Sequence, residues 1–305
     1  MKYIDIGNGK ISASEISLGC MRIANLEVSE VTKLINTAME EGINFFDHAD
    51  IYGGGKSEEV FAEAVDMKPS VREKFIIQTK CGIRKGFYDF SKEHILNSVE
   101  GSLKRLRTDY IDILLLHRPD TLMEPEEVAE AFDILHSSGK VRYFGVSNHN
   151  PMQIELLNKY LNQKIIINQL QLSITNTGMI DFGLNVNMKK DASIDRDGSV
   201  LEYCRLKDIT IQAWSPLQYG FFEGVFLNND KFPELNRKIN EIAEAKGVQN
   251  VAIAIAWILR HPAKIQTIVG TTNIKRLKDI CKASQVELTR QEWYELYRAA
   301  GNQLP

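Results

Sequence analysis

A repeated order of strand and then helix is the feature that most restricts the fold of this chain. Segments typical of strands begin at eight positions, and each is followed by a segment with helical periodicity. Eight such units within 305 residues favour a closed (β/α)8 barrel, the TIM barrel of α/β proteins, over the alternative of a doubly wound open sheet. The strands are expected to begin at Ile16, Ile43, Phe75, Ile111, Val141, Ile165, Ile209 and Gln266.

Segments outside the repeat complete the expected architecture. Residues 3–12 alternate as an N-terminal β-hairpin, which should close the bottom of the barrel. Extra C-terminal helices are expected near residues 235–245 and 290–300. No linker or shift in composition divides the chain, so we expect one barrel domain over residues 1–305. The polar stretch 176–198 lies between two units and is expected to be an active-site loop.

Composition excludes several classes of function. A net charge of -3 gives no reason to expect nucleic acid or an anionic membrane as a partner. The longest apolar run, residues 251–259, is too short to span a bilayer, and the N-terminus lacks the apolar core of a signal peptide, so we expect a cytoplasmic protein. The four cysteines are scattered without metal-ligand spacing. The oligomeric state stays open, and a monomer is compatible with the sequence.

Polar side chains stand at the ends of the expected strands. In the stretch 43–59, an apolar strand ends at Asp47, Tyr52 follows in the loop, and Ser57 is expected to cap the next helix. Strand ends of a parallel barrel face one mouth, where active sites are built. Each residue also has a structural interpretation, such as an Asx-turn aspartate, but one polar group per unit favours a site. The other strand ends carry Gly19 to Arg22, Lys80, His117, Ser147-Asn148, Asn168-Gln169, Trp214-Ser215 and Gly270 to Thr272.

Four of these residues could act together in proton transfer. A tyrosine with a pKa near 10 is a poor acid at neutral pH, but a neighbouring ammonium group would lower that pKa. Lys80 could serve Tyr52 in this way, and Asp47 could fix the position and charge of the lysine. His117 would orient a carbonyl oxygen or relay the proton.

These motifs resemble those of the aldo-keto reductase family, in particular its bacterial NADP-dependent oxidoreductases. Asp47-x4-Tyr52, Lys80 in QTKCG and His117 in LLLHRPD look like the family's catalytic tetrad. The segments GVSNH, NQ, AWSPL and GTTN-x2-R are similar to its cofactor-binding segments, in the same order. The resemblance covers essentially the whole chain.

The resemblance implies NADPH-dependent reduction of a small-molecule aldehyde or ketone to an alcohol by hydride transfer, on a TIM barrel without a Rossmann domain. The absence of a strand leading into G-x-G-x-x-G agrees with this. It also implies that Tyr52 is the general acid, Lys80 lowers its pKa, Asp47 holds Lys80 and His117 orients the carbonyl.

The resemblance further implies a set of cofactor-binding residues. Ser147, Asn148 and Gln169 would hydrogen-bond the carboxamide, and Trp214 would stack on the nicotinamide ring, where the family often has tyrosine. The other residues that the resemblance places along NADP(H) are Gly19, Cys20, Met21, Arg22, Asp47, Ser215, Pro216, Leu217, Tyr219, Gly270, Thr271, Thr272, Arg276 and Asp279.

Two positions depart from the family pattern. Gly270 stands where a lysine commonly precedes the last phosphate-binding hydroxyl, and Ile280 stands where an asparagine often meets the adenine. Arg276, flanked by Lys275, can still bind a 2′-phosphate through two hydrogen bonds. NADP(H) is therefore expected to be preferred over NAD(H), less strongly than in members that have both cations.

Three other interpretations remain. A Schiff-base aldolase would use Lys80 as nucleophile but leaves Tyr52, Gln169 and Trp214 unexplained. A metal-dependent hydrolase would draw on Asp47, His48, Asp50 and His117, but a second histidine at ligand spacing is missing, and we expect no metal. A non-catalytic nicotinamide sensor would lose a tetrad member. The sequence does not name the substrate, whose pocket is expected in residues 83–90, in the region after Arg118 and in residues 176–198.

Overall fold

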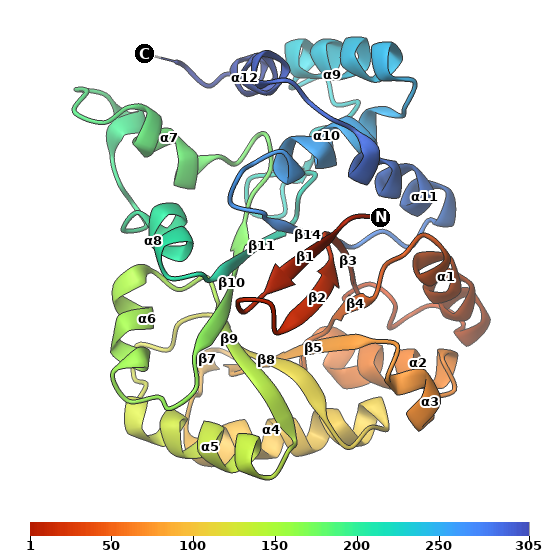
Figure 1. The fold of residues 1–305 in the computed structure, drawn as a ribbon, viewed down its shortest axis with the longest axis vertical. Coiled ribbons are helices and arrows are strands. Elements are labelled where there is room, and N and C mark those ends of the chain that lie inside the picture. Colours follow the sequence, from red (N-terminus) through yellow and green to blue (C-terminus); the bar gives the residue numbers. More distant parts are fainter. Residues whose placement is uncertain (305) are drawn as a thin grey trace.

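The computed structural model describes residues 1–304, in which eight parallel strands form a closed barrel (Figure 1). Barrel strands that follow one another in the sequence are hydrogen-bonded neighbours, and the last barrel strand, β14, pairs with the first, β3, to close the ring. The predicted (β/α)8 fold is therefore confirmed. The barrel strands are β3 (Ile16–Gly19), β4 (Phe45–Asp47), β5 (Ile76–Cys81), β8 (Ile111–His117), β9 (Val141–Ser147), β10 (Ile165–Gln171), β11 (Thr210–Trp214) and β14 (Gln266–Val269).

Helices surround the barrel and bury their apolar faces against it (Figure 1). The helix that follows β5 begins after Ser91, whose hydroxyl accepts the backbone N–H of His94 as an N-cap. Helix α10 (Asn250–Leu259) is buried along nearly its whole length because the neighbouring helices cover it. The outer helices are α1 (Val28–Glu40), α2 (Lys56–Ala64), α4 (Lys92–Leu106), α5 (Pro125–Ser137), α6 (Pro151–Asn158), α8 (Val200–Leu206), α10 (Asn250–Leu259) and α11 (Ile274–Cys281).

The N-terminal hairpin, β1 (Tyr3–Ile6) and β2 (Ile11–Ser14), closes the end of the barrel at which the strands begin. Its apolar side chains form one cluster with Phe45, Ile113 and Ile167 of the strands. In Figure 1 the hairpin lies across the centre of the barrel. The opposite end, where the strands finish, is left for a site.

The extra C-terminal helices α9 (Pro233–Lys246) and α12 (Arg290–Ala299) are present as predicted and pack on each other. Short elements that the sequence did not indicate decorate the connections. They are α3 (Pro69–Arg72), α7 (Gly178–Leu184), the 3-10 turns η1 (Tyr52–Gly55), η2 (Asp191–Ser193) and η3 (Lys282–Gln285), and the hairpins β6 (Ile83–Arg84) with β7 (Phe87–Tyr88) and β12 (Gln218–Tyr219) with β13 (Gly224–Val225).

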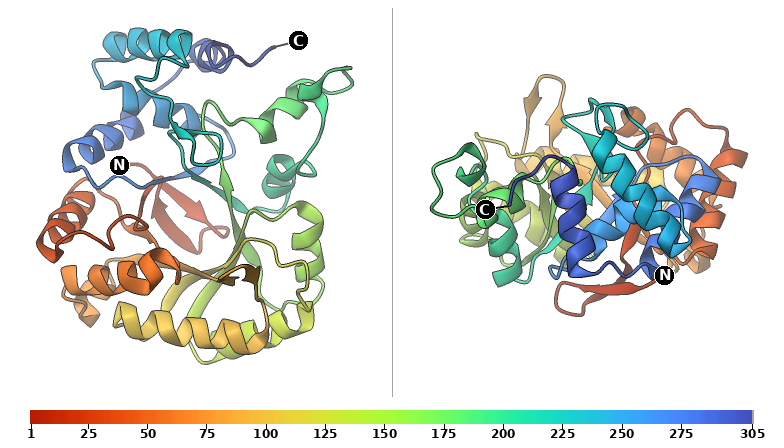
Figure 2. Two further views of the ribbon diagram at one scale, coloured as in Figure 1. Left: turned by 180° about the vertical axis from the view of Figure 1, so that it is seen from behind. Right: turned by 90° about the horizontal axis from the view of Figure 1, so that it is seen from above.

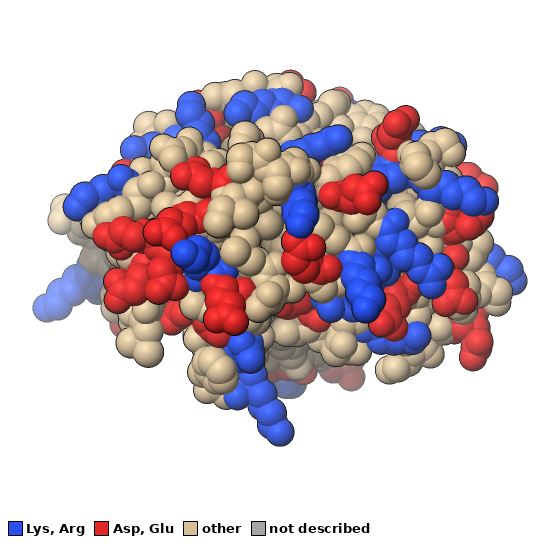
Figure 3. All heavy atoms as spheres, turned by 90° about the horizontal axis from the view of Figure 1, so that it is seen from below, with Lys and Arg blue, Asp and Glu red and all other residues tan. Residues whose placement is uncertain are grey.

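Within residues 1–304, no single helix is long and apolar enough to cross a membrane; α9 and α10 reach that length and composition only as a pair bent by 94°. On the face shown in Figure 3, Lys and Arg side chains are interspersed with Asp and Glu, so that face offers no broad area of one charge.

Candidate active site

The connection between β4 and α2 places Tyr52 over the end of the barrel. Gly53, Gly54 and Gly55 all have positive φ. A Cβ atom on Gly53 would lie 2.4 Å from the Cβ of Ala24, so only glycine fits this turn. The predicted N-cap role of Ser57 is wrong: because the glycines turn the chain directly into the helix, α2 begins at Lys56, after Gly55.

Asp47, Lys80 and Tyr52 form one hydrogen-bonded chain. The Lys80 Nζ lies 2.8 Å from both carboxylate oxygens of Asp47 and 3.1 Å from the Tyr52 hydroxyl. It also donates to the backbone carbonyl of His48 at 2.8 Å. The lysine side chain is completely buried, so its charge depends on these partners rather than on water.

The charges in this chain are set by burial and by the ion pair. Burial lowers the pKa of Lys80, but the Asp47 carboxylate and the Tyr52 hydroxyl raise it, and the net pKa is above its ordinary value. Burial raises the pKa of Tyr52 more than the Lys80 ammonium lowers it, so the net direction is upward. The sequence had suggested a lowered pKa for Tyr52. The structure instead holds a protonated tyrosine beside a charged lysine.

His117, the last residue of β8, faces Tyr52. The two rings are nearly perpendicular, with 6.3 Å between their centroids. Burial, together with the Lys80 and Arg118 charges, holds the pKa of His117 well below its ordinary value. The imidazole is therefore neutral, which makes it a hydrogen-bond donor to an oxygen rather than an acid.

A row of buried glutamines supports Asp47 from inside the barrel. Gln78 and Gln169 each donate one amide hydrogen to Asp47 Oδ1 and one to Gln212 Oε1. Gln212 donates to Gln266, whose amide reaches the carbonyl of Ser14 in the hairpin. Asp47 thus accepts two amide hydrogens besides the ammonium group, which fixes its orientation. Both hydrogens of the Gln169 amide are used here, so only its Oε1 is left for a ligand.

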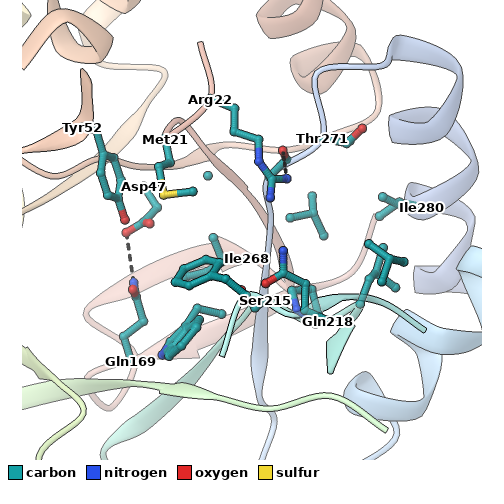
Figure 4. A pocket seen from close by; sticks show the side chains of 18 of the residues that line it. Met21, Arg22, Asp47, Tyr52, Gln169, Ser215, Gln218, Ile268, Thr271 and Ile280 are labelled. Atoms are coloured by element: carbon teal, nitrogen blue, oxygen red, sulfur yellow. Dashed lines mark hydrogen bonds between the residues drawn. The ribbon is translucent and has the colours of Figure 1, made fainter. Parts of the chain in front are cut away.

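A cavity of about 1080 Å³ opens above this cluster at the carboxyl end of the strands. Figure 4 shows Asp47, Tyr52 and Gln169 at one side of it, Thr271 and Ile280 at the other, and Arg22 between them. The predicted site residues that line the cavity are Gly19, Met21, Arg22, Asp47, Tyr52, His117, Ser147, Asn148, Gln169, Trp214, Ser215, Pro216, Leu217, Gly270, Thr271, Arg276 and Asp279.

The indole of Trp214 is fixed at the Tyr52 end of the cavity. Its Nε1 donates to Asn148 Oδ1 at 3.1 Å, and Asn148 Nδ2 donates to Ser147 Oγ at 2.8 Å. Phe222 stacks on the indole with 6.0 Å between centroids, and Phe221 meets it edge-on. These contacts present one aromatic plane at a constant angle.

Cationic side chains gather at the other end. Arg22 lines the cavity and donates to the carbonyl of Gly270 at 3.1 Å. Lys275 and Arg276 are exposed in the first turn of α11, which Asn273 caps by accepting the backbone N–H of Arg276. A helix N-terminus with free cations nearby favours a phosphate group.

Four predicted residues do not line the cavity. Lys80 and Cys20 are buried beneath it, and the Cys20 thiol faces the Leu18 carbonyl. Thr272 lies outside, and Tyr219 packs on Phe232. These positions therefore offer no direct side-chain contact with a ligand in the cavity.

The expected substrate loops are corrected in three places, the first being the segment directly after Arg118, from which no residue lines the cavity. No residue of 176–198 lines the cavity, because α7 packs away from it and Asp181 accepts a hydrogen bond from Tyr297 of α12. Phe90 is buried against His149 instead of facing a ligand. The wall is formed partly by residues that sequence reasoning missed, namely Ile51, Phe221, Phe222, Val225, Asn228, Gln249, Asn250 and Val251. The adjacent aromatic residues at positions 221 and 222 are a sequence signal that could have indicated part of this wall.

Residues 15–300 match the sequence profile of the Aldo/keto reductase family. The chain belongs to this family. It is 40% identical over 288 residues to the uncharacterized oxidoreductase YcsN of Bacillus subtilis (strain 168), covering 90% of this chain and 89% of that protein. It is 36% identical over 305 residues to the 6-dehydroglucose reductase of Agrobacterium fabrum, covering 95% of each.

Solved structures agree on the fold of this aldo-keto reductase. The thermostable aldo-keto reductase Tm1743, in complex with the inhibitor epalrestat, gives a TM-score of 0.79 at 27% identity, covering 98% of this chain and 100% of that one. An aldo-keto reductase from Klebsiella pneumoniae in complex with NADPH gives 0.79 at 23% identity, over 99% and 96% of the two chains, and supports the fold alone. The protein is therefore an oxidoreductase of the aldo-keto reductase type.

The donor set of a metal-dependent hydrolase is not assembled in this aldo-keto reductase. His48 is fully buried with its ring edge-on to Phe61, and burial lowers its pKa to about 3. Asp47 is committed to Lys80. Across residues 1–304, no three His, Cys, Asp or Glu side chains are grouped to hold a metal ion.

Proposed function

We propose that this aldo-keto reductase reduces a small-molecule aldehyde or ketone to an alcohol with NADPH. The observation that carries the proposal is the buried chain from Asp47 through Lys80 to the Tyr52 hydroxyl, which ends in a large cavity beside Trp214. A proton donor at the wall of a cavity that also fits a dinucleotide is what carbonyl reduction requires.

The residues present fit a phosphorylated dinucleotide. Trp214 supplies a fixed aromatic plane for the nicotinamide, and Gln169 Oε1 can accept from its carboxamide. Ser147 can donate to the carboxamide oxygen, since its own oxygen already accepts from Asn148. At the far end, Arg22 would meet the pyrophosphate, and Arg276 would meet the 2′-phosphate.

When bound, the reduced nicotinamide would supply the hydride. The chain's own residues then manage the oxygen of the carbonyl. His117, neutral at the pH of the cell, donates a hydrogen bond that orients the oxygen. As charge develops on that oxygen, Tyr52 gives up its proton, and the Lys80 ammonium, 3.1 Å away, stabilises the phenolate that remains. Asp47 keeps Lys80 charged and in place.

The preference for NADPH over NADH rests on Arg276. Its guanidinium is exposed at the start of α11, and Lys275 adds a second cation. A planar guanidinium can hold a phosphate through two hydrogen bonds, whereas the NADH hydroxyl offers no charge to pair. Gly270, in place of a lysine, removes one further contact, so the preference should be moderate.

The test is consumption of NADPH and of NADH with a panel of aldehydes, ketones and sugars. We expect turnover of at least one carbonyl class, and faster turnover with NADPH at low cofactor concentration. If NADPH binds but no carbonyl is reduced, the sensor interpretation gains instead. Trapping of substrate on Lys80 by borohydride would favour the aldolase.

A further inference from the structure

Arg118 is a cation in the cavity without an acceptor. It follows His117 directly and lines the cavity, but no hydrogen bond or ion pair joins its guanidinium to any residue in the described part of the chain. Two other cations at this mouth have partners within the protein, whereas Lys275 and Arg276 at the far end are assigned to the cofactor. Lys80 pairs with Asp47, and Arg22 donates to the Gly270 carbonyl.

Aromatic rings hold Arg118 in position. Its guanidinium carbon lies 5.6 Å from the centroid of the Trp214 ring and 5.4 Å from that of the Phe221 ring. Cation–π contacts of this kind fix a guanidinium while leaving its N–H groups unused. The two rings come from β11 and the loop after it, so the tertiary fold, not the local chain, sets this arrangement.

The backbone also adopts a costly conformation at this residue. Arg118 has φ of +75°, in the left-handed region that side-chain-bearing residues rarely occupy. Such a conformation is unfavourable for a residue with a side chain and persists only where the surroundings enforce it, often at ligand sites. Here it turns the chain at the end of β8, so that Arg118 lines the same cavity as His117.

No residue among 1–304 pairs with this charge. Asp47, the one carboxylate of the tetrad, is occupied by Lys80 and two glutamine amides. His117 is neutral, and the Arg118 charge is one of the reasons that it is. The acceptor for the five N–H groups of Arg118 must therefore come from solvent or from a bound ligand.

We propose that Arg118 is a specificity residue that donates to oxygen atoms on the substrate carbon chain next to the reacting carbonyl, so that the enzyme prefers carbonyl compounds bearing a carboxylate or hydroxyl groups over hydrocarbon ones. This inference rests on the proposed carbonyl reduction. The shared chemistry is an acceptor oxygen close to the carbonyl, and a carboxylate would gain most because it can bind both prongs of the guanidinium.

The experiment compares three aldehydes of similar size: succinic semialdehyde, which bears a carboxylate, glyceraldehyde, which bears hydroxyls, and butanal, which bears neither. We expect the native enzyme to show higher kcat/KM for at least one oxygenated aldehyde than for butanal. Arg118→Leu should reduce that ratio by about 10- to 100-fold, the range for a charge-assisted hydrogen bond, and Arg118→Lys should restore part of it. The aldehyde that loses most identifies the source of the oxygen.

Arg142→Leu is the matched control. Arg142 also lies over an aromatic ring, that of Tyr110, but it pairs with Asp112 at the opposite end of the barrel and does not line the cavity. Its removal should leave the ratio unchanged. The inference would be overturned, with carbonyl reduction left intact, if the native enzyme had the same kcat/KM for butanal as for the oxygenated aldehydes. An unchanged kcat/KM ratio in Arg118→Leu would overturn it in the same way. A loss of NADPH affinity in Arg118→Leu as large as the loss in the kcat/KM ratio would also overturn it, since Arg118 would then serve the cofactor. Failure of the native enzyme on every carbonyl would instead count against the proposed function.

Discussion

Two buried ion pairs stand at opposite ends of the same barrel. Asp47 and Lys80 meet where β4 and β5 finish, with an N–O distance of 2.8 Å. Arg72 and Asp112 meet where β5 and β8 begin, with an N–O distance of 2.6 Å. Both pairs join an acid and a base with side chains at most 10% exposed. Their chemistry is alike, but their surroundings are not.

The Arg72–Asp112 pair is closed. Arg72 also donates to Thr108 and to the carbonyls of Phe75 and Tyr110, so each of the three guanidinium nitrogens donates a hydrogen bond within the protein. Asp112 in turn accepts from a backbone N–H and from a second arginine. A fully satisfied pair of this kind locks the start of two strands and has nothing to offer a ligand.

The Asp47–Lys80 pair is open at one point. Besides Asp47, Lys80 contacts the side-chain hydroxyl of Tyr52, and Tyr52 belongs to the cavity wall. Residues at the carboxyl ends of barrel strands serve catalysis, whereas residues at the amino ends serve stability. The comparison therefore predicts that damage to the first pair appears in turnover and damage to the second in the free energy of unfolding.

The largest expected effect is that of Lys80→Met on turnover. Without the ammonium group, the Tyr52 phenolate is no longer stabilised, and kcat should fall by about 10²–10⁴-fold. Removing the group that lowers the Tyr52 pKa should also move the pH dependence of any residual activity upward. Steady-state kinetics across pH measure both. A variant with near-native turnover would show that the pair does not serve the chemical step.

Arg72→Met should act on stability. It leaves the buried Asp112 carboxylate with only the Ile77 backbone N–H at 2.9 Å and the half-exposed Arg142 at 3.2 Å, so the free energy of unfolding should fall by about 3 kcal/mol, the lower end for breaking a buried pair. Urea unfolding measures the loss. The kcat of the folded variant should stay close to that of the native enzyme, and a large loss of kcat would break the contrast between the two ends.

Arg276→Ala should act on the cofactor alone. NADPH binding should weaken by about 1.5–3 kcal/mol, because a charge-assisted contact with the 2′-phosphate is lost, and NADH binding should change far less. Fluorescence titration of both cofactors provides the measurement. Equal losses for the two would mean that Arg276 does not read the phosphate.

The smallest effect concerns pH. Reduction needs Tyr52 protonated, and its pKa lies above the ordinary value of 10.0, so the rate should decline only at strongly alkaline pH as the tyrosine loses its proton. The depressed pKa of His117 means that this residue is already neutral near pH 6.5 and adds no inflection there. A rate that drops between pH 6 and 8 as the imidazole deprotonates would assign the proton to His117 instead.

The sequence predicted the barrel well because the repeated strand and helix segments follow from local patterns, and the same patterns indicated which polar residues stand at the strand ends. Strand periodicity placed Asp47, Lys80 and His117 at strand ends, and a closed barrel brings strand ends together. The glutamine row escaped prediction because Gln212 and Gln266 meet only once the barrel has closed. The wall residues Phe221 and Phe222 lie in an irregular connection, where no periodicity indicates which way a side chain points.

Two predictions were wrong for a related reason: the start of α2 at Ser57 and the role of residues 176–198 as an active-site loop. A serine before two glutamates is a good capping signal, but the three preceding glycines decide where the helix begins. The 176–198 segment looked like a polar loop, yet the contact between Asp181 and Tyr297 draws α7 toward α12 and away from the mouth. Both outcomes depend on tertiary contacts that one stretch of sequence does not contain.

The most direct test of the central claim is the turnover of Tyr52→Phe, measured alongside its NADPH affinity. The substitution removes the hydroxyl that lies 3.1 Å from Lys80 and leaves the ring that faces His117. The open ion pair predicts a folded protein with native NADPH affinity and a kcat for aldehyde reduction lower by about 10²–10⁴-fold. Near-native reduction by a variant that binds NADPH normally would contradict the account and leave Tyr52 as only a wall of the cavity.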